Sequence, residues 1–381
     1  MLFTAPELGE PEHRVLEQVQ DLKQELRLRL HQPRRWYGSL RRASLARNIQ
    51  GSNSIEGFDA ELDDAAAVEL GEETLSTSEE TQLALKGYRD AMTFVLQLSN
   101  EPRFHYGEQL LKSLHFMMTG YDLENRPGLF RAGAAYVRND DTGETVYEGA
   151  NVDDVDALVH ELVVQLDTQD GGECPVMVRA AMAHLNLVMI HPFRDGNGRM
   201  ARCLQTLVLA REQILEPTFC SIEEYLGHNT QAYYDVLAEV GGGYWQPERD
   251  ARAWVRFTLT AHYRQVKTYL RRIRESEQLW DELENLVARH DLPERTVPVL
   301  FDAASGYRVR NATYRAIHRD EISEGVASRD LRALVATDLL LAHGEKRGRY
   351  YTRSEELYGV RQRIIDARNP RDDVDPFAQS S

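Results

Sequence analysis

The sequence predicts a mainly α-helical protein with one short β-hairpin near its middle and a small separate unit near its C-terminus. Apolar residues recur at steps of three and four through most of the 381-residue chain, which is the period of a buried helix face. Two β-prone runs around a polar, glycine-containing turn interrupt this pattern at residues 135–148. The composition, 42% hydrophobic and 28% charged, excludes a wholly disordered chain.

Net charge and cysteine content exclude several classes of protein. With 61 acidic and 45 basic residues the formal net charge is −16, the wrong sign for non-specific binding to nucleic acid or to an anionic membrane. No apolar run approaches the length of a membrane span, and residues 1–11 lack the basic start and apolar core of a signal peptide. Three cysteines without CxxC spacing predict neither a disulfide framework nor a cysteine zinc site. We therefore expect a cytoplasmic protein with reduced thiols and no membrane partner.

Residues 1–100 are predicted to be an N-terminal helical region. The first helix carries an apolar stripe formed by Val15, Val19, Leu22, Leu26 and Leu30. A second amphipathic segment runs from Leu40 to Ile49 and into residues 52–57. The following stretch, 59–80, is strongly acidic, and we expect it to be solvent-exposed surface. Helical periodicity returns between Leu83 and Val95.

Residues 101–245 are predicted to form a helical core around the hairpin. In the hairpin, Tyr136 and Val137 precede the polar turn 139–143, and a second β-prone pair follows it. After a glycine-containing break, Pro175 begins the next helix, a position where its missing N–H costs nothing. This helix runs to Met189 and is followed by a polar loop and a further apolar helix.

The C-terminal third is predicted to contain a helical extension and a small domain. Residues 246–292 form a charged helical extension or linker. Within residues 293–358, a serine-capped helix at 326–335 is followed by two short strands around a basic turn. A helix followed by a hairpin is the signature of a winged-helix domain, a variant of the helix-turn-helix. The tail, residues 370–381, is predicted to be disordered.

One stretch carries an unusual density of chemically active side chains: residues 191–202 read His-Pro-Phe-Arg-Asp-Gly-Asn-Gly-Arg-Met-Ala-Arg. Two glycines bracket Asn197 where a loop enters a helix, and such a turn presents backbone N–H groups to phosphate. Arg199 and Arg202 are three residues apart and share a helix face, from which both can grip phosphate oxygens. Asp195 is a hard oxygen ligand suited to Mg²⁺, and His191 can accept a proton near neutral pH.

This stretch matches the motif H-x-F-x-[D/E]-G-N-G-R-x-x-R at every position and so resembles the Fic (Fic/Doc) family. The resemblance implies a mainly helical core, with the motif loop between two central helices and a hairpin flap over the site. It also implies transfer of AMP from ATP to a Ser, Thr or Tyr hydroxyl of a target protein. By position, His191 would be the general base and Asp195 would hold Mg²⁺, while Phe193 would anchor the loop.

The resemblance assigns the remaining motif residues to the phosphates. Asn197, together with the backbone of Gly196 and Gly198, would cradle the α- and β-phosphates. Arg199 and Arg202 would steady the outer phosphates. Nothing in the motif separates AMP transfer from removal of AMP, or from transfer of another phosphate-containing group.

A second, shorter match lies upstream, where Ser52–Gly57 fits the family's inhibitory motif [S/T]-x-x-x-E-[G/N]. The matching positions are Ser52, Glu56 and Gly57. The resemblance is to the class in which the inhibitory helix precedes the core, and there Glu56 would reach Arg202 and compete with the γ-phosphate. The alternative is that Glu56 is a solvated surface charge.

Weaker candidates lie around these motifs. Tyr136 and Val137 in the flap are candidates for registering a target segment by strand addition, and simple hairpin packing is the equal alternative. Residues 127–131 resemble the family segment that leads into the flap, in which Gly128 would serve the turn and Arg131 either the surface or the pocket. His184 is expected to be a hydrogen-bonded core histidine.

The expected partners follow from these interpretations. A target protein with an acceptor hydroxyl is required, and members of the family often form homodimers. DNA contact through residues 328–352 is not favoured, because Asp330 lies between Arg329 and Arg332 and spoils a basic reading face. A regulator that senses nucleotide and binds DNA is the alternative from a different class, although such a sensor has no need for a base at His191.

Overall fold

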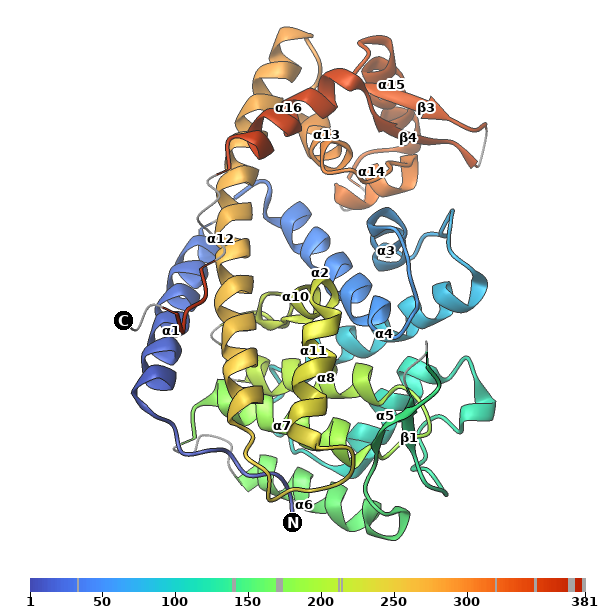
Figure 1. Ribbon diagram of the computed structural model, residues 1–381. Helices are drawn as coiled ribbons and strands as arrows, with labels where there is room; N and C mark the ends of the chain where they lie inside the picture. Colours follow the sequence, from blue (N-terminus) through green and yellow to red (C-terminus); the bar gives the residue numbers. More distant parts are fainter. Residues whose placement is uncertain are drawn as a thin grey trace.

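The structure is a computed structural model that describes residues 1–32, 34–138, 142–168, 174–211, 213, 215–318, 321–345, 348–368 and 374–378. It is mainly helical, with two small antiparallel hairpins, and the predicted fold class is confirmed (Figure 1). No helix in these ranges is both long and apolar enough to cross a membrane.

The N-terminal region consists of four helices, α1 (Glu10–His31), α2 (Tyr37–Ser54), α3 (Leu62–Glu69) and α4 (Glu79–Leu98). The α4 helix begins where the Ser78 hydroxyl accepts a hydrogen bond from the Thr81 N–H, an ordinary N-cap. The inhibitory motif occupies the C-terminal end of α2 and the turn that follows it. Residues 52–57 are therefore fixed by a helix whose other side packs on the core.

The core consists of α5 (Glu108–Thr119), η1 (Leu123–Asn125), β1 (Tyr136–Arg138), β2 (Thr145–Glu148), η2 (Val152–Asp154), α6 (Val155–Thr168), α7 (Val176–Ile190), α8 (Asn197–Arg211), α9 (Pro217–Cys220), α10 (Glu223–His228) and α11 (Thr230–Gly241). Nearly every residue of α7 and α8 is buried, and in α8 the buried set includes the polar side chains of Arg199, Arg202 and Gln205. The two helices pack directly against each other and hold the motif loop between them.

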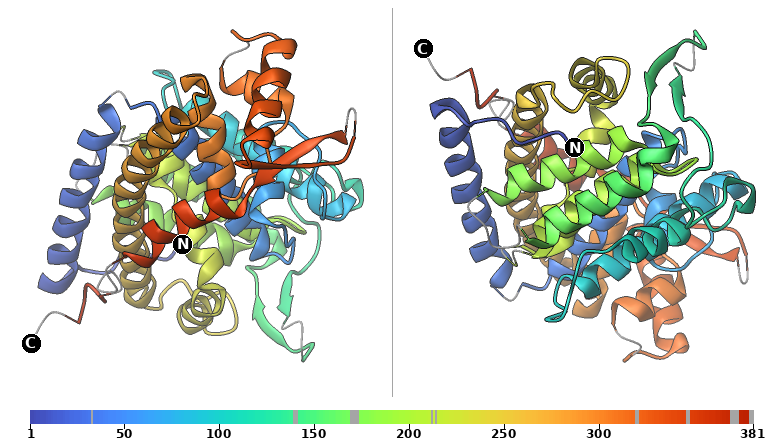
Figure 2. Two further views of the ribbon diagram at one scale, coloured as in Figure 1. Left: turned by 90° about the horizontal axis from the view of Figure 1, so that it is seen from above. Right: turned by 90° about the horizontal axis from the view of Figure 1, so that it is seen from below.

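The flap is the antiparallel pair of β1 and β2, in which Val137 faces Tyr147. The Tyr147 hydroxyl donates to the carbonyl of Met189 at 3.0 Å, which fastens the flap to the end of α7. Part of the predicted turn, residues 139–141, lies outside the described residues. Figure 2 shows the hairpin projecting from the helical body.

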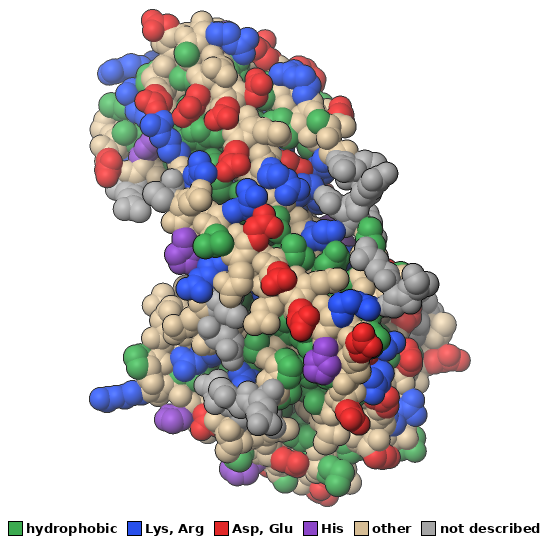
Figure 3. Space-filling model, turned by 90° about the vertical axis from the view of Figure 1, so that its left-hand side faces the viewer, with side chains coloured by type: hydrophobic (Ala, Val, Ile, Leu, Met, Phe, Trp, Pro, Cys, Tyr) green, Lys and Arg blue, Asp and Glu red, His purple; other side chains and the backbone are tan. Residues whose placement is uncertain are grey.

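The predicted extension at 246–292 is one helix, α12 (Arg252–Arg289), which packs along its length against the body of the protein (Figure 1). Its Trp254 indole donates to the Ala181 carbonyl of α7 at 2.7 Å. On α1, the buried carboxylate of Glu12 pairs with Arg256 at 2.6 Å. On the face that carries α1 and α12, acidic and basic side chains are intermixed without a patch of single sign (Figure 3).

The C-terminal unit consists of η3 (Glu294–Thr296), α13 (Val297–Ala304), α14 (Asn311–Ile317), α15 (Glu324–Ala336), β3 (Leu340–His343), β4 (Tyr350–Arg353) and α16 (Glu355–Asp366). Three helices followed by a hairpin are what the winged-helix interpretation requires, and that assignment stays a prediction. The predicted boundary at 358 is wrong, because residue 358 lies inside α16. This helix packs against α12 and α13. In the tail, the structure describes residues 374–378, where the Phe377 ring lies 5.4 Å from the Arg256 guanidinium, and the predicted disorder of residues 370–381 stays a prediction.

The acidic stretch 59–80 is not the free surface that the sequence predicted. Its Asp64 is buried, and its carboxylate lies 3.2 Å from the guanidinium of Arg308, which follows α13. Asp63 is also 3.2 Å from that guanidinium, and its carboxylate accepts from the Arg308 N–H at 2.7 Å. This buried cluster joins α3 to the C-terminal unit.

Replacing Arg308 with alanine is expected to destabilise the protein by about 3–5 kcal/mol, because it leaves buried carboxylates without their counter-ion. Urea unfolding of Arg308→Ala checks this. The matched control is Arg35→Ala, whose ion pairs are mostly exposed and which should cost no more than about 1 kcal/mol. Equal losses in the two variants would contradict the structural role of the cluster.

Candidate active site

The α7 and α8 helices position the motif loop between them. The α7 helix ends at His191, which adopts a left-handed backbone conformation with φ 54° and donates its N–H to the Leu187 carbonyl. The chain then turns through residues 192–196, and α8 begins at Asn197. Because both helices are buried, the loop between them is held on a rigid base.

The imidazole of His191 has one nitrogen committed and one free for chemistry. Its Nδ1 lies 3.1 Å from the Val188 carbonyl, which can only accept, so Nδ1 carries the proton and Nε2 is the acceptor. Burial lowers the pKa of His191 below its ordinary value of 6.5, and nearby Arg131 adds to this, although the Val188 carbonyl opposes it. The side chain is therefore neutral at pH 7 and ready to accept a proton.

Asn197 holds the loop in shape, and its contact with phosphate stays a prediction from the resemblance. Its Oδ1 accepts from the Phe193 N–H and its Nδ2 donates to the Phe193 carbonyl, both at 2.9 Å. The Phe193 ring is fully buried and stacks on His115 with centroids 3.8 Å apart. Phe193 is thus the loop anchor that the sequence predicted, and Asn197 closes the loop around it.

The two glycines leave an open anion cradle at the N-terminus of α8. Gly196 has φ 75°, a left-handed conformation, and a Cβ there would lie 2.9 Å from the Thr119 methyl. At Gly198, a Cβ would lie 2.3 Å from Glu56 Oε1 and 3.0 Å from Arg202 Nη1. A carboxylate from α2's end therefore lies over the helix N-terminus, where phosphate would bind.

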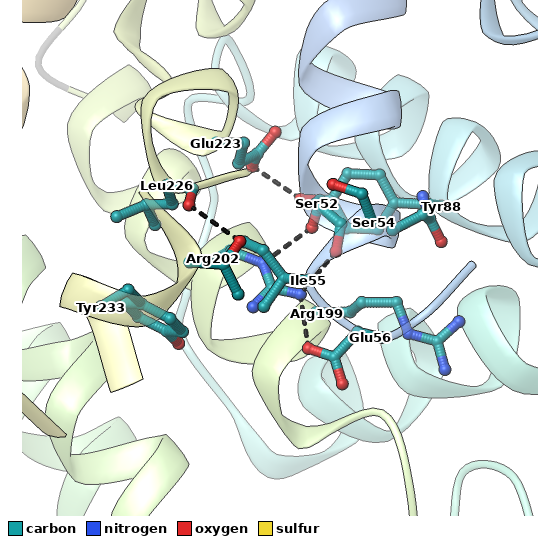
Figure 4. A network of polar contacts seen from close by, with 12 residues as sticks. Ser52, Ser54, Ile55, Glu56, Tyr88, Arg199, Arg202, Glu223, Leu226 and Tyr233 are labelled. Atoms are coloured by element: carbon teal, nitrogen blue, oxygen red, sulfur yellow. Dashed lines mark hydrogen bonds and ion pairs between the residues drawn. The ribbon is translucent and has the colours of Figure 1, made fainter. Parts of the chain in front are cut away.

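Arg202 is held by both ends of the inhibitory motif (Figure 4). Its Nε donates to the Ser52 hydroxyl and its Nη2 to the Ser52 carbonyl, each at 2.8 Å. The same Nη2 pairs with Glu56 Oε1 at 2.7 Å. Burial raises the pKa of Glu56, but the positive charges of Arg202 and Arg199 lower it by more. The pKa therefore lies below its usual value and the carboxyl group is ionised. Glu56 is not a solvated surface charge.

Gly57 ends the inhibitory segment. Its φ of 80° is left-handed, and its N–H donates to the Ser54 carbonyl at 3.1 Å. The next residue, Phe58, donates its N–H to the Asn53 carbonyl, and its ring lies 5.0 Å from the Arg199 guanidinium. This turn places the Glu56 carboxylate toward α8 (Figure 4).

Asp195 is the candidate metal ligand. Its side chain is 45% exposed, and its Oδ2 lies 3.4 Å from Arg199 Nη2. Nowhere in the described ranges do three or more His, Cys, Asp or Glu side chains form a metal site. A single accessible carboxylate fits Mg²⁺, which takes its other ligands from phosphates and water.

Two further residues support the site: His115 carried no signal in the sequence, and the sequence left the role of Arg131 open. His115 donates to the Asp195 carbonyl from Nε2 at 2.9 Å and accepts the Gly128 N–H on Nδ1. Arg131 is buried, and its guanidinium donates to the carbonyls of His191, Gly133 and Ala150. Arg131 therefore ties the flap segment to the loop, which settles the choice that the sequence left open.

A buried polar group also lies behind Arg202. Glu223 accepts from the Tyr88 hydroxyl at 2.6 Å and from the Thr206 hydroxyl at 3.2 Å. Burial raises the pKa of Glu223 to about 7, despite these hydrogen bonds. His184 is a core histidine as predicted, because its ring nitrogens contact Gln205 and the Tyr233 hydroxyl.

The flap residues flank a cavity that reaches His191. Tyr136 is 51% exposed, whereas Val137 is half-buried. A cavity of about 390 Å³ is lined by both His191 and Tyr136. His191 is therefore accessible to a side chain that enters this cavity.

Comparison with known proteins identifies the core. Residues 106–209 match the Fic/DOC family. Over 91 residues the chain is 34% identical to a protein named protein adenylyltransferase Fic from Nematostella vectensis and 40% identical to its namesake from Aedes aegypti. These matches cover 24% of the chain and 18% and 16% of the relatives. The chain thus matches less than a fifth of the length of these relatives.

The fold is also found in solved structures. A Fic family protein from Desulfovibrio desulfuricans aligns with a TM-score of 0.58 over 92% of this chain and 98% of that one, at 19% identity. Fic-1 from Caenorhabditis elegans aligns with a TM-score of 0.54 over 70% of this chain and 73% of that one, at 22% identity. At such identities the likeness concerns the fold. The motif loop, the helices that hold it and the sequence match together show that residues 106–209 of this chain form a Fic domain.

Proposed function

We propose that the protein transfers AMP from ATP to a Ser, Thr or Tyr hydroxyl of a target protein and inhibits itself through Glu56. The observation that carries this proposal is the Glu56 carboxylate over Gly198, paired with Arg202 at 2.7 Å. A carboxylate from the same chain occupies a cradle built for an anion. The names of the relatives, protein adenylyltransferase, favour ATP as the source of that anion.

In the proposed reaction, the acceptor hydroxyl attacks the α-phosphorus of ATP. A P–O bond forms to the hydroxyl oxygen, the α–β bridging bond breaks, and pyrophosphate leaves with the bonding electrons. His191 Nε2 accepts the hydroxyl proton, while its Nδ1 is held by Val188. The helix N-terminus at Gly198 stabilises the charge on the phosphates.

The residues present fit the nucleotide and a metal ion. Nη1 of Arg202 is buried and makes no hydrogen bond to any described residue, so it is a spare donor for a phosphate oxygen. Asp195 would hold Mg²⁺, which would neutralise the phosphates and the pyrophosphate leaving group. Arg199 keeps Asp195 within reach of the cradle through their 3.4 Å contact.

A second candidate is hydrolysis of AMP from a modified protein. The Glu56 side chain is 21% exposed and ionised, so it can accept a hydrogen bond from an attacking water molecule. This reaction would need Glu56, whereas AMP transfer would be hindered by it. Loss of AMP from a pre-modified protein in wild type, but not in Glu56→Gly, would favour hydrolysis.

The position of the label in ATP tests the class of reaction. Once the labelling by lysate alone is subtracted, a Glu56→Gly variant incubated with ATP and cell lysate is expected to label protein from the α-phosphate but not from the γ-phosphate. The reason is that the acceptor retains AMP and the outer phosphates leave as pyrophosphate. Labelling from the γ-phosphate would instead indicate a kinase and would refute the proposal.

The pKa of His191 predicts how the rate depends on pH. Because this pKa lies below 6.5 in the folded protein, the imidazole is unprotonated at pH 7 and the base is available. We expect the transfer rate of Glu56→Gly to be flat near neutrality and to fall on acidification, with a midpoint below 6.5. A pH–rate profile measured at saturating ATP checks this, and a midpoint above pH 7 would contradict it.

A further inference from the structure

The cavity beside His191 has a composition unlike the rest of the chain. Its described lining consists of Arg126, Leu129, Phe130, Arg131, Ala132, Gly133, Ala134, Ala135, Tyr136, His191 and Arg194. The lining contains no Asp or Glu, although the whole chain has a net charge of −16. The wall of the cavity next to His191 is therefore free of carboxylates among its described lining residues, although the protein as a whole is acidic.

The shape of this wall suits an extended segment of another protein. Residues 132–134 are exposed and small, so they leave the backbone leading into β1 open to a neighbour. β1 pairs with β2 along one edge, and within the described ranges no other strand pairs with it. A segment that adds to this free edge would pass the cavity and His191.

Two cations stand at the rim of the cavity. Arg126 and Arg194 are both exposed. The Arg194 guanidinium is held by a 2.9 Å hydrogen bond to the Glu124 carbonyl, so its position is fixed by the loop. Arg126 lines the cavity and adopts a left-handed backbone conformation with φ 53°, which is uncommon for a residue other than glycine. The guanidinium groups of exposed arginines form paired hydrogen bonds with carboxylates, so Arg126 and Arg194 favour an acidic ligand.

We propose that the acceptor segment of the target protein carries an Asp or Glu close to its hydroxyl residue, and that Arg126 and Arg194 select it. This inference rests on the proposed AMP transfer for the role of His191 but not for the binding of the segment. The apolar side chains between the arginines and His191 receive the rest of the segment. Target recognition therefore combines electrostatic contacts at the two arginines with apolar contacts along the rest of the cavity wall.

Three peptide libraries test the proposal on the 381-residue Glu56→Gly protein. Each library has a central Ser, Thr or Tyr and random apolar positions, with flanking residues that are Asp or Glu, Asn or Gln, or Lys. Binding is measured by fluorescence anisotropy without ATP, and AMP transfer is measured with α-labelled ATP. We expect the acidic library to exceed the lysine library about tenfold in both measurements.

Charge reversal assigns the preference to the two arginines. The double variant Arg126→Glu/Arg194→Glu should lose the preference for the acidic library or favour the lysine library, with unchanged ATP affinity. The matched control is Arg27→Glu, an exposed arginine on α1, which should leave the preference unchanged. A preference unaffected by the double variant, no binding of any library, or a fall in ATP affinity would overturn the proposal.

The two readouts separate this proposal from the one on which it rests. If acidic peptides bind and the double variant abolishes binding, the recognition surface stands even when no AMP is transferred to any protein. In that case it is the proposed reaction that fails. If AMP is transferred equally to all three libraries, the reaction stands and the selection by arginines fails.

Discussion

Replacing Glu56 with glycine is expected to raise the rate of AMP transfer about a hundredfold or more. The carboxylate of Glu56 lies over the α8 N-terminus and binds Arg202 at 2.7 Å, so wild type offers negative charge where phosphate must bind. Removing this like-charge clash from a partly buried site could be worth several kcal/mol, which corresponds to that factor. Incorporation of α-labelled AMP into lysate proteins measures the rate.

Two control variants separate charge from shape at this position. Glu56→Gln keeps the size of the side chain but removes its charge, and we expect it to activate less than Glu56→Gly because it still fills the cradle. Glu101→Gly removes an exposed carboxylate from the loop after α4 and should leave the rate at the wild-type level. Equal rates for wild type and Glu56→Gly would refute the inhibitory role of residues 52–57 without touching the motif loop.

Replacing His191 with alanine, in the Glu56→Gly background, is expected to lower transfer by about 10²–10⁴-fold. The imidazole is the group that faces the cavity with a free, unprotonated nitrogen, so its loss leaves the acceptor hydroxyl without a base. ATP affinity should be nearly unchanged, because the cradle is formed by Gly198 and its neighbours. Single-turnover transfer and ATP titration report the two effects separately.

The conformation of His191 calls for a second variant. Its φ of 54° strains an alanine, whereas asparagine tolerates the left-handed region. His191→Asn should therefore keep the turn and still lose transfer. Full activity in this folded variant would show that His191 is not the base.

The parts of the site that could be predicted from the sequence are those encoded by neighbouring residues. The turn glycines, the paired arginines and the histidine lie within residues 191–202, in the loop after α7 and the first turns of α8, so their spacing carried the prediction. The pairing of Glu56 with Arg202 spans 146 residues, and only the resemblance to a family placed them together. Physical reasoning from spacing alone does not reach across that distance.

Side chains whose role depends on contacts with distant parts of the chain could not be predicted from the sequence. His115 lies on an ordinary amphipathic helix, and nothing local indicates that it stacks on Phe193. The resemblance assigned Asn197 to phosphate, but nothing in the sequence indicated that its amide also closes the loop through two hydrogen bonds to Phe193. Which partner a polar side chain chooses depends on packing, and packing is set by the whole fold.

The same limit explains the error at residues 59–80. An acidic run is usually solvated, but this one meets Arg308 from the C-terminal unit, 245 residues away from Asp63. Taken separately, the charged residues of α3 and those of the C-terminal unit are each typical of a solvent-exposed surface. Only their approach in the fold turns them into a buried ion pair.

ATP binding in the absence of turnover tests most directly the claim that Glu56 competes with the outer phosphates. The measurement is calorimetric titration of ATP, and of AMP as a control, into His191→Ala and into His191→Ala/Glu56→Gly. Charge-assisted contacts to phosphate contribute about 1.5–3 kcal/mol each, so we predict that the double variant binds ATP about tenfold or more tightly, with AMP affinity unchanged. Equal ATP affinity in the two proteins would contradict the account.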